Sequence, residues 1–285
     1  MPDIDFVRAD ADRLEKVARR CADDESRPLL LALAARDDFN GAWLALDQGT
    51  PIAAAVVACL EDERFVSALF VEPSFRREGV ARELLARAGG DAAETRRGAI
   101  VDLSQPAAVA FALRAGLALQ TPIVAVAGAI PADDELLRLA GGMQHFGVGT
   151  MDPIAQSYAL DGIDRQTRGS ARPEDHRQLF DGARGTAFFS DDELVGYAYV
   201  WPSGRIGPLA CVAASYVAPF LAYAMASARR EFGATWCTAL VPGTNARALR
   251  TALGAGLTVQ RSYAYASEAS PAQLDCYVGG PPVAW

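Results

Sequence analysis

The sequence predicts an α/β fold made of two copies of one unit, each of about 140 residues. Two observations support this prediction: two pairs of similar segments recur at nearly the same spacing, and strand-like and helix-like segments follow in the same order in both halves. The length of 285 residues suits two domains of ordinary size. Apolar residues make up 51% and charged residues 22%, which is enough apolar surface for a packed core.

The stronger similarity joins residues 105–127 to residues 245–267. At a constant offset of 140, seven of these 23 positions are identical, including the Ala-Gly-Leu at 115–117 and 255–257. Each segment reads as a helix that ends at a glycine and leads into an apolar strand.

A second similarity joins residues 43–57 to residues 186–200 at an offset of 143, each a strand–turn–strand with acidic residues or glycine in the turn. The near-equal offsets indicate a duplication. We therefore expect an N-terminal domain over 1–140, a Gly-rich linker over 141–150 and a C-terminal domain over 151–285.

The first copy gives the element order of the unit. Apolar spacing predicts strands at 4–8, 41–47, 51–60, 64–72, 98–103 and 117–127, and helices at 10–22, 26–36, 79–96, 106–115 and 133–140. In the second copy, 153–168 and 173–182 read as helices. The C-terminal GGPPVAW cannot be helical and is expected to lie on the surface.

Charge and composition exclude several functional classes. The net charge of −8 and pI near 4.9 argue against nucleic acid as the main partner, because phosphate binding needs a basic face. The N-terminus lacks the basic and apolar regions of a secretory signal. Residues 206–228 carry no charge but contain prolines and many alanines, so a buried strand and helix explain them better than a membrane span.

The five cysteines are odd in number and form no CxxC pair, and neither histidine lies at metal-ligand spacing from them. We therefore expect reduced thiols in a cytoplasmic protein and no metal site.

The most informative string is VEPSFRREGVARELLARA, residues 71–88. A buried strand ends at Val71, and a helix begins near Gly79. A strand–loop–helix of this kind presents backbone N–H groups at the positive end of a helix, which is an anion site. Gly79 allows the backbone to approach the anion, and Arg76 and Arg77 add charge suited to phosphate. The candidate binding residues are Phe70, Val71, Arg76, Arg77, Glu78, Gly79, Val80 and Ala81.

This string resembles the V-x-P-x-x-[QR]-x-x-G-x-[GA] signature of the GNAT superfamily of N-acetyltransferases. The resemblance covers the first half and implies a mixed, mostly antiparallel central sheet flanked by helices in each domain. It implies that the loop cradles the pyrophosphate of acetyl-CoA, the co-substrate. It also implies that a backbone N–H near Phe70 or Val71 polarises the thioester carbonyl, on which negative charge develops.

The sequence departs from the family at both catalytic positions. Ser67 stands where a glutamate is common, and Ala112 stands where a tyrosine commonly protonates the thiolate. The amine must be deprotonated to attack, so a base is needed. The candidates are Asp102, which lies in an apolar strand, Glu63, and water relayed past Ser67.

The second half resembles the diverged C-terminal domains of tandem GNAT proteins. It lacks the arginines and the Gly-x-[GA] step of the loop, and its corresponding helix is apolar almost all round. Asn245 stands at the family's helix-start asparagine, where the first half has Gln105. The aromatic residues Tyr197, Tyr199 and Trp201 either wall an acceptor pocket or belong to the core.

The resemblance implies an acyl-CoA-dependent N-acyltransferase that moves an acetyl or short acyl group to the amine of a small molecule or peptide. We expect a monomer or homodimer without nucleic-acid or membrane partners. The alternative is a non-catalytic acyl-CoA-binding or regulatory protein, which the missing glutamate and tyrosine favour.

Overall fold

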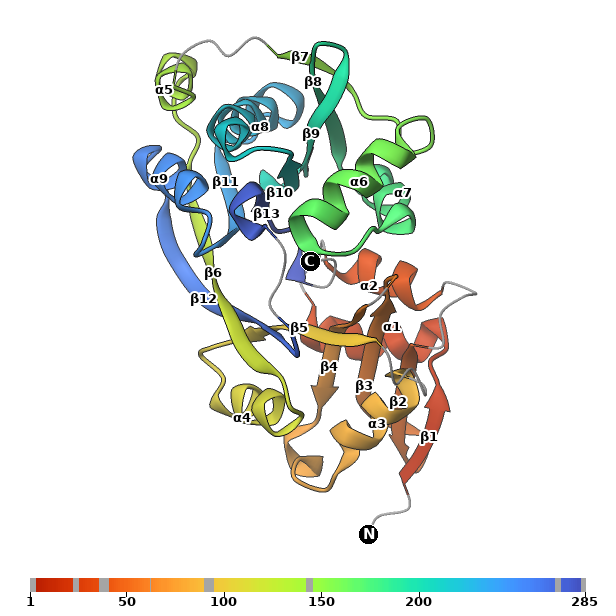
Figure 1. Ribbon diagram of the computed structural model, residues 1–285. Coiled ribbons are helices and arrows are strands. Elements are labelled where there is room, and N and C mark those ends of the chain that lie inside the picture. The colour runs from red at the N-terminus through yellow and green to blue at the C-terminus, as the bar shows by residue number, and fades with distance from the viewer. Residues whose placement is uncertain are drawn as a thin grey trace. The chain divides into compact units, whose positions relative to one another are not determined.

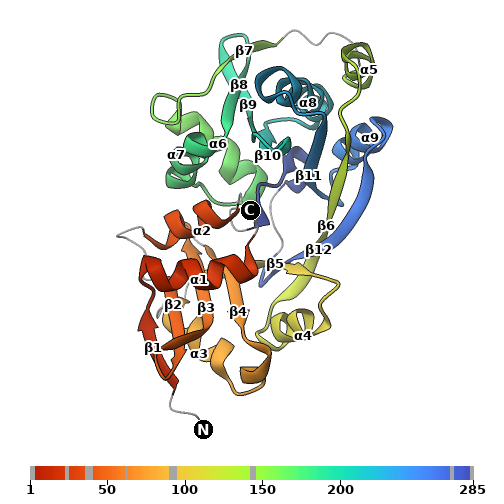
Figure 2. The same ribbon diagram turned by 180° about the vertical axis from the view of Figure 1, so that it is seen from behind.

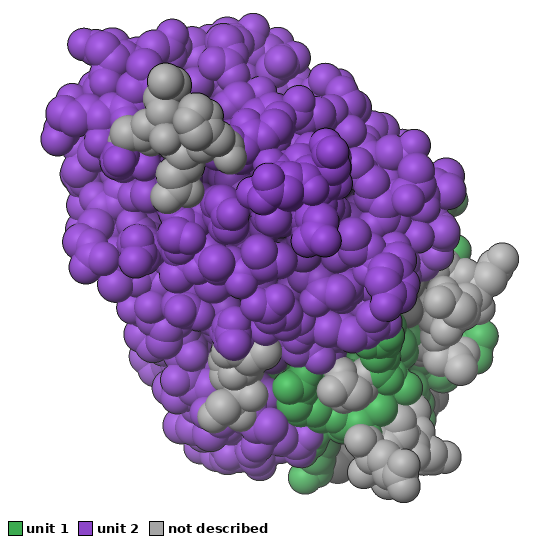
Figure 3. Space-filling model, turned by 45° about the horizontal axis from the view of Figure 1, so that its top comes forward, with its two compact units in different colours: residues 1–100, 282–285 green, residues 101–281 purple. Residues whose placement is uncertain are grey.

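The computed structural model describes residues 4–22, 26–35, 41–61, 63–89, 95–141, 146–269 and 273–282, without the side chain of Cys21. The chain divides into two compact units, one of residues 1–100 with 282–285 and one of residues 101–281 (Figure 3). Both are mixed α/β structures with a mostly antiparallel sheet, which confirms the predicted fold class.

The sheet of unit 1 has the order β1-β2-β3-β4-β5, antiparallel except for the parallel pair β4–β5. The strands are β1 (Ile4–Arg8), β2 (Ala42–Asp47), β3 (Thr50–Cys59), β4 (Glu63–Val71) and β5 (Arg96–Asp102), of which the last two residues belong to unit 2. The helices are α1 (Ala11–Cys21), α2 (Ser26–Ala34) and α3 (Val80–Gly89), with the short 3-10 helix η1 (Pro73–Phe75) before α3.

The helices cover both faces of this sheet. Helices α1 and α2 pack on one face and α3 on the other (Figures 1 and 2). Val80, Leu84 and Ala88 of α3 recur at helical spacing and pack against the alanine-rich centre of β3, so this face is apolar where the helix lies. The small alanines let α3 lie close to the sheet.

The sheet of unit 2 has the order β12-β6-β11-β10-β9-β8-β7. The strands are β6 (Ala118–Ala129), β7 (Gly147–Thr150), β8 (Arg184–Ser190), β9 (Glu193–Val200), β10 (Arg205–Cys211), β11 (Trp236–Pro242) and β12 (Thr258–Ser267), and the two-residue strand β13 (Tyr277–Val278) pairs with β10.

Helices also cover both faces of the second sheet. The helices are α4 (Pro106–Arg114), α5 (Asp133–Leu139), α6 (Ser157–Arg168), α7 (Pro173–Gly182), α8 (Val217–Phe232) and α9 (Ala246–Gly254), with 3-10 turns η2 (Ala214–Tyr216) and η3 (Leu274–Cys276). Along β9, Ala198 and Val200 face α8, whereas Tyr197 and Tyr199 face α6 and α7.

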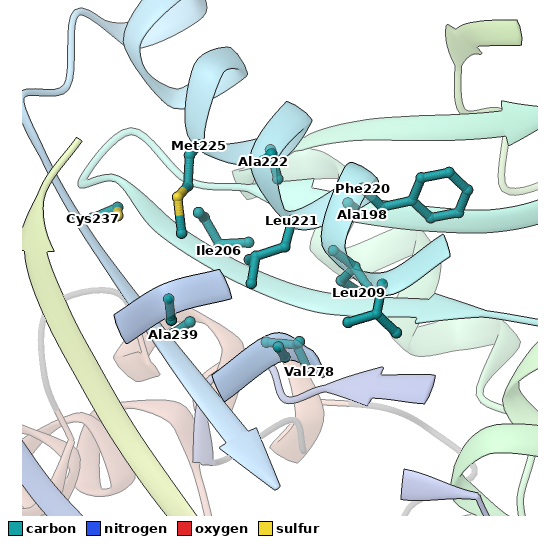
Figure 4. Close-up of a cluster of buried hydrophobic side chains, with 14 of the residues drawn as sticks. Ala198, Ile206, Leu209, Phe220, Leu221, Ala222, Met225, Cys237, Ala239 and Val278 are labelled. Atoms are coloured by element: carbon teal, nitrogen blue, oxygen red, sulfur yellow. The ribbon is translucent and has the colours of Figure 1, made fainter. Parts of the chain in front are cut away.

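Helix α8 is buried almost all round, as its composition predicts. Phe220, Leu221 and Met225 pack on residues of β9, β10 and β11, and Val278 of β13 joins the same cluster (Figure 4). The charge-free segment 206–228 is thus the buried strand β10 followed by α8. Among the described residues, no helix is long and apolar enough to cross a membrane.

The repeat seen in the sequence recurs in backbone geometry. The turns after α4 and α9 both have glycine in the left-handed region, Gly116 at φ 88° and Gly256 at φ 81°. The hairpin turns β2–β3 and β8–β9 both have two successive left-handed residues, Gln48-Gly49 and Asp191-Asp192. These pairs keep the offsets of 140 and 143.

The compact units divide the chain at a different place from the repeat. Strand β6, which ends the first sequence copy, pairs with β11 on one side and β12 on the other, so it belongs to unit 2. Of the expected linker 141–150, Gly147–Thr150 forms β7 against β8, and residues 142–145 lie outside the described part. The domain ranges 1–140 and 151–285 stay a prediction about the repeat.

Of the predicted surface tail 279–285, residues 279–281 are buried instead, and residues 283–285 lie outside the described part of the chain. Tyr277, Val278, Gly279, Gly280 and Pro281 are all buried. Tyr277–Val278 adds an antiparallel strand to β10, and Gly279 forms a bridge to Leu240 of β11. The open edges of β10 and β11 therefore bury residues 277–279.

Candidate functional site

Strands β4 and β5 of unit 1 pair along only part of their length. Their parallel register runs from Glu63 opposite Arg96 to Val66 opposite Ala99. From Ser67 to Val71, β4 continues along β3, and within the described part of the chain none of these residues pairs with β5. The backbone N–H and C=O groups on the β5 side of this segment therefore take no part in strand pairing. An extended ligand can form hydrogen bonds with such groups.

Ser67 lies at the point where the two strands separate. Between Ala68, opposite Val56, and Val66, opposite Val57, it has no partner residue on β3, so it is the extra residue of a β-bulge. Such bulges re-aim a side chain and are common beside active sites. Ser67 is 8% exposed, and its Oγ has no hydrogen-bond partner in the described part of the chain.

The loop after β4 has the backbone of an anion site. Arg77 (φ 72°) and Gly79 (φ 85°) both lie in the left-handed region. When right-handed and left-handed backbone conformations alternate along a chain, successive N–H groups point toward the same side. They then form a concave anion-binding nest. The first hydrogen bond of α3 runs from the N–H of Glu83 to the carbonyl of Gly79 at 3.1 Å, so the N–H groups just before it point out of the helix start.

The loop side chains divide between solvent and core as an anion site requires. Arg76, Arg77 and Glu78 are exposed, whereas Val80 is buried under the sheet and anchors the helix start. The Arg76 Nε donates to the carbonyl of Val71 at 3.0 Å, which ties its guanidinium to the end of β4. The structure thus brings the predicted residues from Phe70 to Ala81 together in one strand–loop–helix.

Glu63 lies at the other end of the paired part of β4. It is fully buried and 4.0 Å from the Nη2 of Arg96, its register partner on β5. Four residues of strand separate it from Ser67, a distance of about 13 Å. This position favours a structural role for the carboxylate.

Asp102 caps the turn between β5 and α4. Its carboxylate accepts from the N–H of Ser104 at 2.9 Å and from the Ser104 hydroxyl at 2.7 Å, and Arg261 of β12 lies at 3.7 Å. Burial alone would raise the pKa of Asp102, but the Ser104 hydrogen bonds and the Arg261 charge together lower it. A carboxylate with a lowered pKa and bound partners is a weak base, so this geometry favours the structural role.

The corresponding separation in unit 2 is filled by the chain itself. The parallel strands β10 and β11 pair at Arg205 and Ile206 and then part beside a bulge in β10 at 207–208. Strand β13 lies in the opening. A Cβ on Gly207 would approach the carbonyl oxygen of Gly279 to 2.0 Å, so only glycine admits this close backbone contact.

Asn245 fixes this C-terminal strand. Its Oδ1 accepts from the N–H of Ala248 at 2.9 Å as the N-cap of α9, and its Nδ2 donates to the carbonyl of Tyr277 at 2.9 Å. The asparagine that the resemblance assigns to the helix start thus holds the protein's own backbone. Gln105, its counterpart, makes no side-chain cap.

The aromatic residues of β9 belong to the core. Asp164 of α6 accepts hydrogen bonds from the Tyr197 hydroxyl and from Arg172 Nε (3.1 Å), and its Oδ2 lies 2.9 Å from His176 Nε2. The Tyr199 hydroxyl lies 3.0 Å from His176 Nδ1. All five residues are almost completely buried. The spacing of Leu160, Ile163, Asp164 and Thr167 on one helix face was the sequence signal for this network.

The comparisons with known proteins agree with this geometry. Residues 38–116 match the family model described as an acetyltransferase (GNAT) domain, a range that includes β4, the loop and α3. The first half of the chain thus contains a GNAT domain, over the matched residues. No curated protein matches the sequence.

Solved structures extend the fold likeness over the whole chain. A Pyrococcus horikoshii protein described as an acetyltransferase has a TM-score of 0.73 at 16% identity, covering 100% of this chain and 96% of that one. A GCN5-related N-acetyltransferase from Sphaerobacter thermophilus has a TM-score of 0.62 at 17% identity, with coverages of 94% and 96%. A tandem GNAT protein from the clavulanic acid biosynthesis pathway gives 0.59 at 16%, with 93% and 98%. The chain therefore has the tandem GNAT fold.

Proposed function

We propose that this protein transfers an acetyl or short acyl group from a CoA thioester to an amine, and that unit 1 carries the site. The observation behind the proposal is the combination in β4 of an unpaired strand edge, a bulge at Ser67 and a left-handed loop at the start of α3. The match of residues 38–116 to a GNAT domain supports it.

The residues of unit 1 fit acetyl-CoA. The N–H groups around Gly79 and the exposed guanidinium groups of Arg76 and Arg77 suit a pyrophosphate. The backbone edge from Ser67 to Val71 suits an arm that carries amide groups, and the N–H groups near Phe70 and Val71 suit the thioester oxygen. The bound thioester would supply the activated acyl group.

Proton removal from the amine is assigned to water held at Ser67. A free alkylamine is mostly protonated at neutral pH and must lose a proton to attack. Asp102 and Glu63 have ion-pair or hydrogen-bond partners, whereas the buried Ser67 hydroxyl has donor and acceptor capacity left over where the strands part. This hydroxyl can hold a water that receives the proton, and the low pKa of a CoA thiol makes a separate acid unnecessary.

A non-catalytic acyl-CoA-binding protein is the second candidate. Within Ser67–Val71 there is no acid, and the position of the family tyrosine is Ala112, a small residue that is 5% exposed. Both candidates bind acetyl-CoA, so binding alone does not separate them.

Acceptor-dependent release of CoA thiol separates the two. Purified protein with acetyl-CoA is screened against amines, amino acids, aminoglycosides and peptide N-termini by a colorimetric thiol reagent. We expect thiol release above the acceptor-free rate with one class of amine. Tight acetyl-CoA binding without stimulated release by any acceptor class would support the non-catalytic protein.

Calorimetry tests the location of the site. We expect one acetyl-CoA per chain, because β13 fills the corresponding opening in unit 2. Two equivalent sites per chain would contradict this.

A further inference from the structure

The opening between β10 and β11 carries two thiols beside the strand that fills it. Leu209 pairs with Val278 and Ala210 with Tyr277 in an antiparallel register. Continuing this register by one residue places Cys211, the last residue of β10, opposite Cys276, the residue before β13. Directly opposed residues of antiparallel strands have Cα atoms about 4.5–5.5 Å apart, within the range that a disulfide spans.

Contacts show that the two residues meet. The Cys211 thiol donates to the backbone carbonyl of Cys276 at 3.6 Å and to that of Ala213 at 3.2 Å. Cys211 is 0% exposed and Cys276 3%, so both sulfurs lie in the same buried region. The hydrogen bond between the thiols, with burial, raises the pKa of Cys211, and the same hydrogen bond lowers the pKa of Cys276.

We propose that Cys211 and Cys276 form a reversible disulfide that fixes the C-terminal strand in the opening between β10 and β11. The bond would close a loop from the end of β10 to the start of β13. It would hold in place the segment whose other anchors are the side chain of Asn245 and the N–H of Gly279, bonded to the Leu240 carbonyl at 2.7 Å.

The chemistry is thiol–disulfide exchange with a small disulfide such as oxidised glutathione. The Cys276 thiolate attacks one sulfur of that disulfide, its S–S bond breaks, and one glutathione thiolate leaves. The Cys211 thiol then loses its proton and attacks the Cys276 sulfur, which releases the second glutathione thiolate. Two protein thiols are oxidised and one external disulfide is reduced.

Local opening of the C-terminal strand gives the oxidant access. Strand β13 has only two ladder residues, and Gln273 and Asp275, just before it, are exposed. Short elements with few ladder hydrogen bonds open at a lower free energy than the core. Cys276 would become accessible first, and its lowered pKa makes it the attacking group.

The test uses the full chain, oxidised glutathione and peptide mapping. After alkylation of remaining thiols, trypsin cleavage places Cys211 in peptide 206–229, Cys276 in 262–285 and Cys237 in 231–247. We expect the first two peptides to be linked, the link to disappear with dithiothreitol, and the melting temperature to rise by about 5 °C on oxidation.

Matched variants make the assignment specific. Cys211→Ala and Cys276→Ala should each abolish the link and the rise in melting temperature. Cys237→Ala, which removes a buried thiol of β11 that has no cysteine partner among the described residues, should retain both. If wild-type protein under oxidant keeps both thiols alkylatable on denaturation, or links another pair, the proposal is wrong. The wild-type mapping decides this even where an alanine variant fails to fold.

Discussion

Gln120 and Gln260, which lie 140 residues apart in the sequence, are each the extra residue of a β-bulge in the ladder that pairs β6 with β12. Val259 lies opposite Val126 and Arg261 opposite Ala125, so Gln260 is bulged; Tyr265 lies opposite Thr121 and Ala266 opposite Leu119, so Gln120 is bulged. Each copy of the sequence repeat therefore contributes one bulged glutamine at the same position of its strand. A local two-fold axis that relates β6 to β12 requires this.

The first prediction concerns this pair. Deleting Gln260, which pairs with no residue of β6, leaves the neighbouring pairs of the ladder in place and removes the bulge. Strand β12 would then lose the local twist of the bulge, and we expect the free energy of unfolding to fall by about 1–3 kcal/mol. Gln260→Ala keeps the bulge and should change the free energy of unfolding by no more than about 1 kcal/mol. Urea unfolding compares the two. Equal stability of the deletion and the alanine variant would show that the bulge does not stabilise the ladder.

The second prediction concerns the charge of the loop. Arg76→Ala removes one charge-assisted contact to the proposed pyrophosphate, worth about 1.5–3 kcal/mol, so acetyl-CoA affinity should fall tenfold or more. Arg19→Ala is the matched control, because this exposed arginine lies on α1, which packs on the opposite face of the sheet from α3, and it should leave affinity nearly unchanged. Isothermal titration measures both. Equal affinities for the two variants would overturn the loop assignment.

The third prediction concerns the backbone of the loop. Arg77 lies at φ 72°, a conformation that costs a non-glycine residue about 1–2 kcal/mol. Glycine relieves this strain, but it also gains conformational freedom in the unfolded state. The free energy of unfolding of Arg77→Gly should therefore equal that of the wild type or exceed it by up to about 1 kcal/mol. Arg82→Gly within α3 should lose about 1 kcal/mol. A comparable loss in both would contradict the left-handed backbone at Arg77.

The fourth prediction separates Ser67 from Asp102. Ser67→Ala removes a buried hydroxyl that has no partner among the described residues, so the melting temperature should hold or rise slightly. If the hydroxyl holds the proton-accepting water, kcat/KM should fall by about 10-fold to 100-fold. Asp102→Asn can still accept from the Ser104 N–H, and kcat/KM should change less than about threefold. A loss of about 100-fold or more in Asp102→Asn, with partial rescue at higher pH, would make Asp102 the base.

The fifth prediction concerns the buried network of unit 2. Burial alone would raise the pKa of Asp164, but Arg172 and His176 hold it well below its ordinary value. The ionised Asp164 carboxylate therefore contributes fully to stability above about pH 4, the pKa of an aspartate in the unfolded chain. This contribution is lost as the pH falls below that value. Asp164→Asn should cost about 3–5 kcal/mol at neutral pH, because it removes the buried carboxylate that pairs with Arg172.

The pH dependence of the difference is the sharper measurement. Subtracting the unfolding free energy of Asp164→Asn from that of the wild type cancels the other carboxylates. We expect this difference to be constant from neutral pH to about pH 5 and to shrink toward about pH 2. A difference that stays constant through the acid range would show that the Asp164 pKa is not lowered.

The sequence by itself determined the element order, the duplication and the candidate anion loop. These depend on local signals: the 3.6-residue and two-residue apolar periods, the glycines that end α4 and α9, and the Arg-x-x-Gly step after β4. Of the predicted helix 79–96, Val80–Gly89 is helical and Arg96 already begins β5, whereas residues 90–94 lie outside the described part of the chain.

Only the tertiary structure decided which strands pair. The sequence assigns 117–127 to the first copy, yet β6 lies between β11 and β12, and the composition of GGPPVAW does not show that the residues before it fill an opening in the second sheet. Strand pairing joins residues far apart in the chain, and its energy comes from burying one edge against another. Local composition carries no record of that partner, so the bulge at Ser67, the partners of Asp164 and the opposition of Cys211 and Cys276 became visible only in the fold.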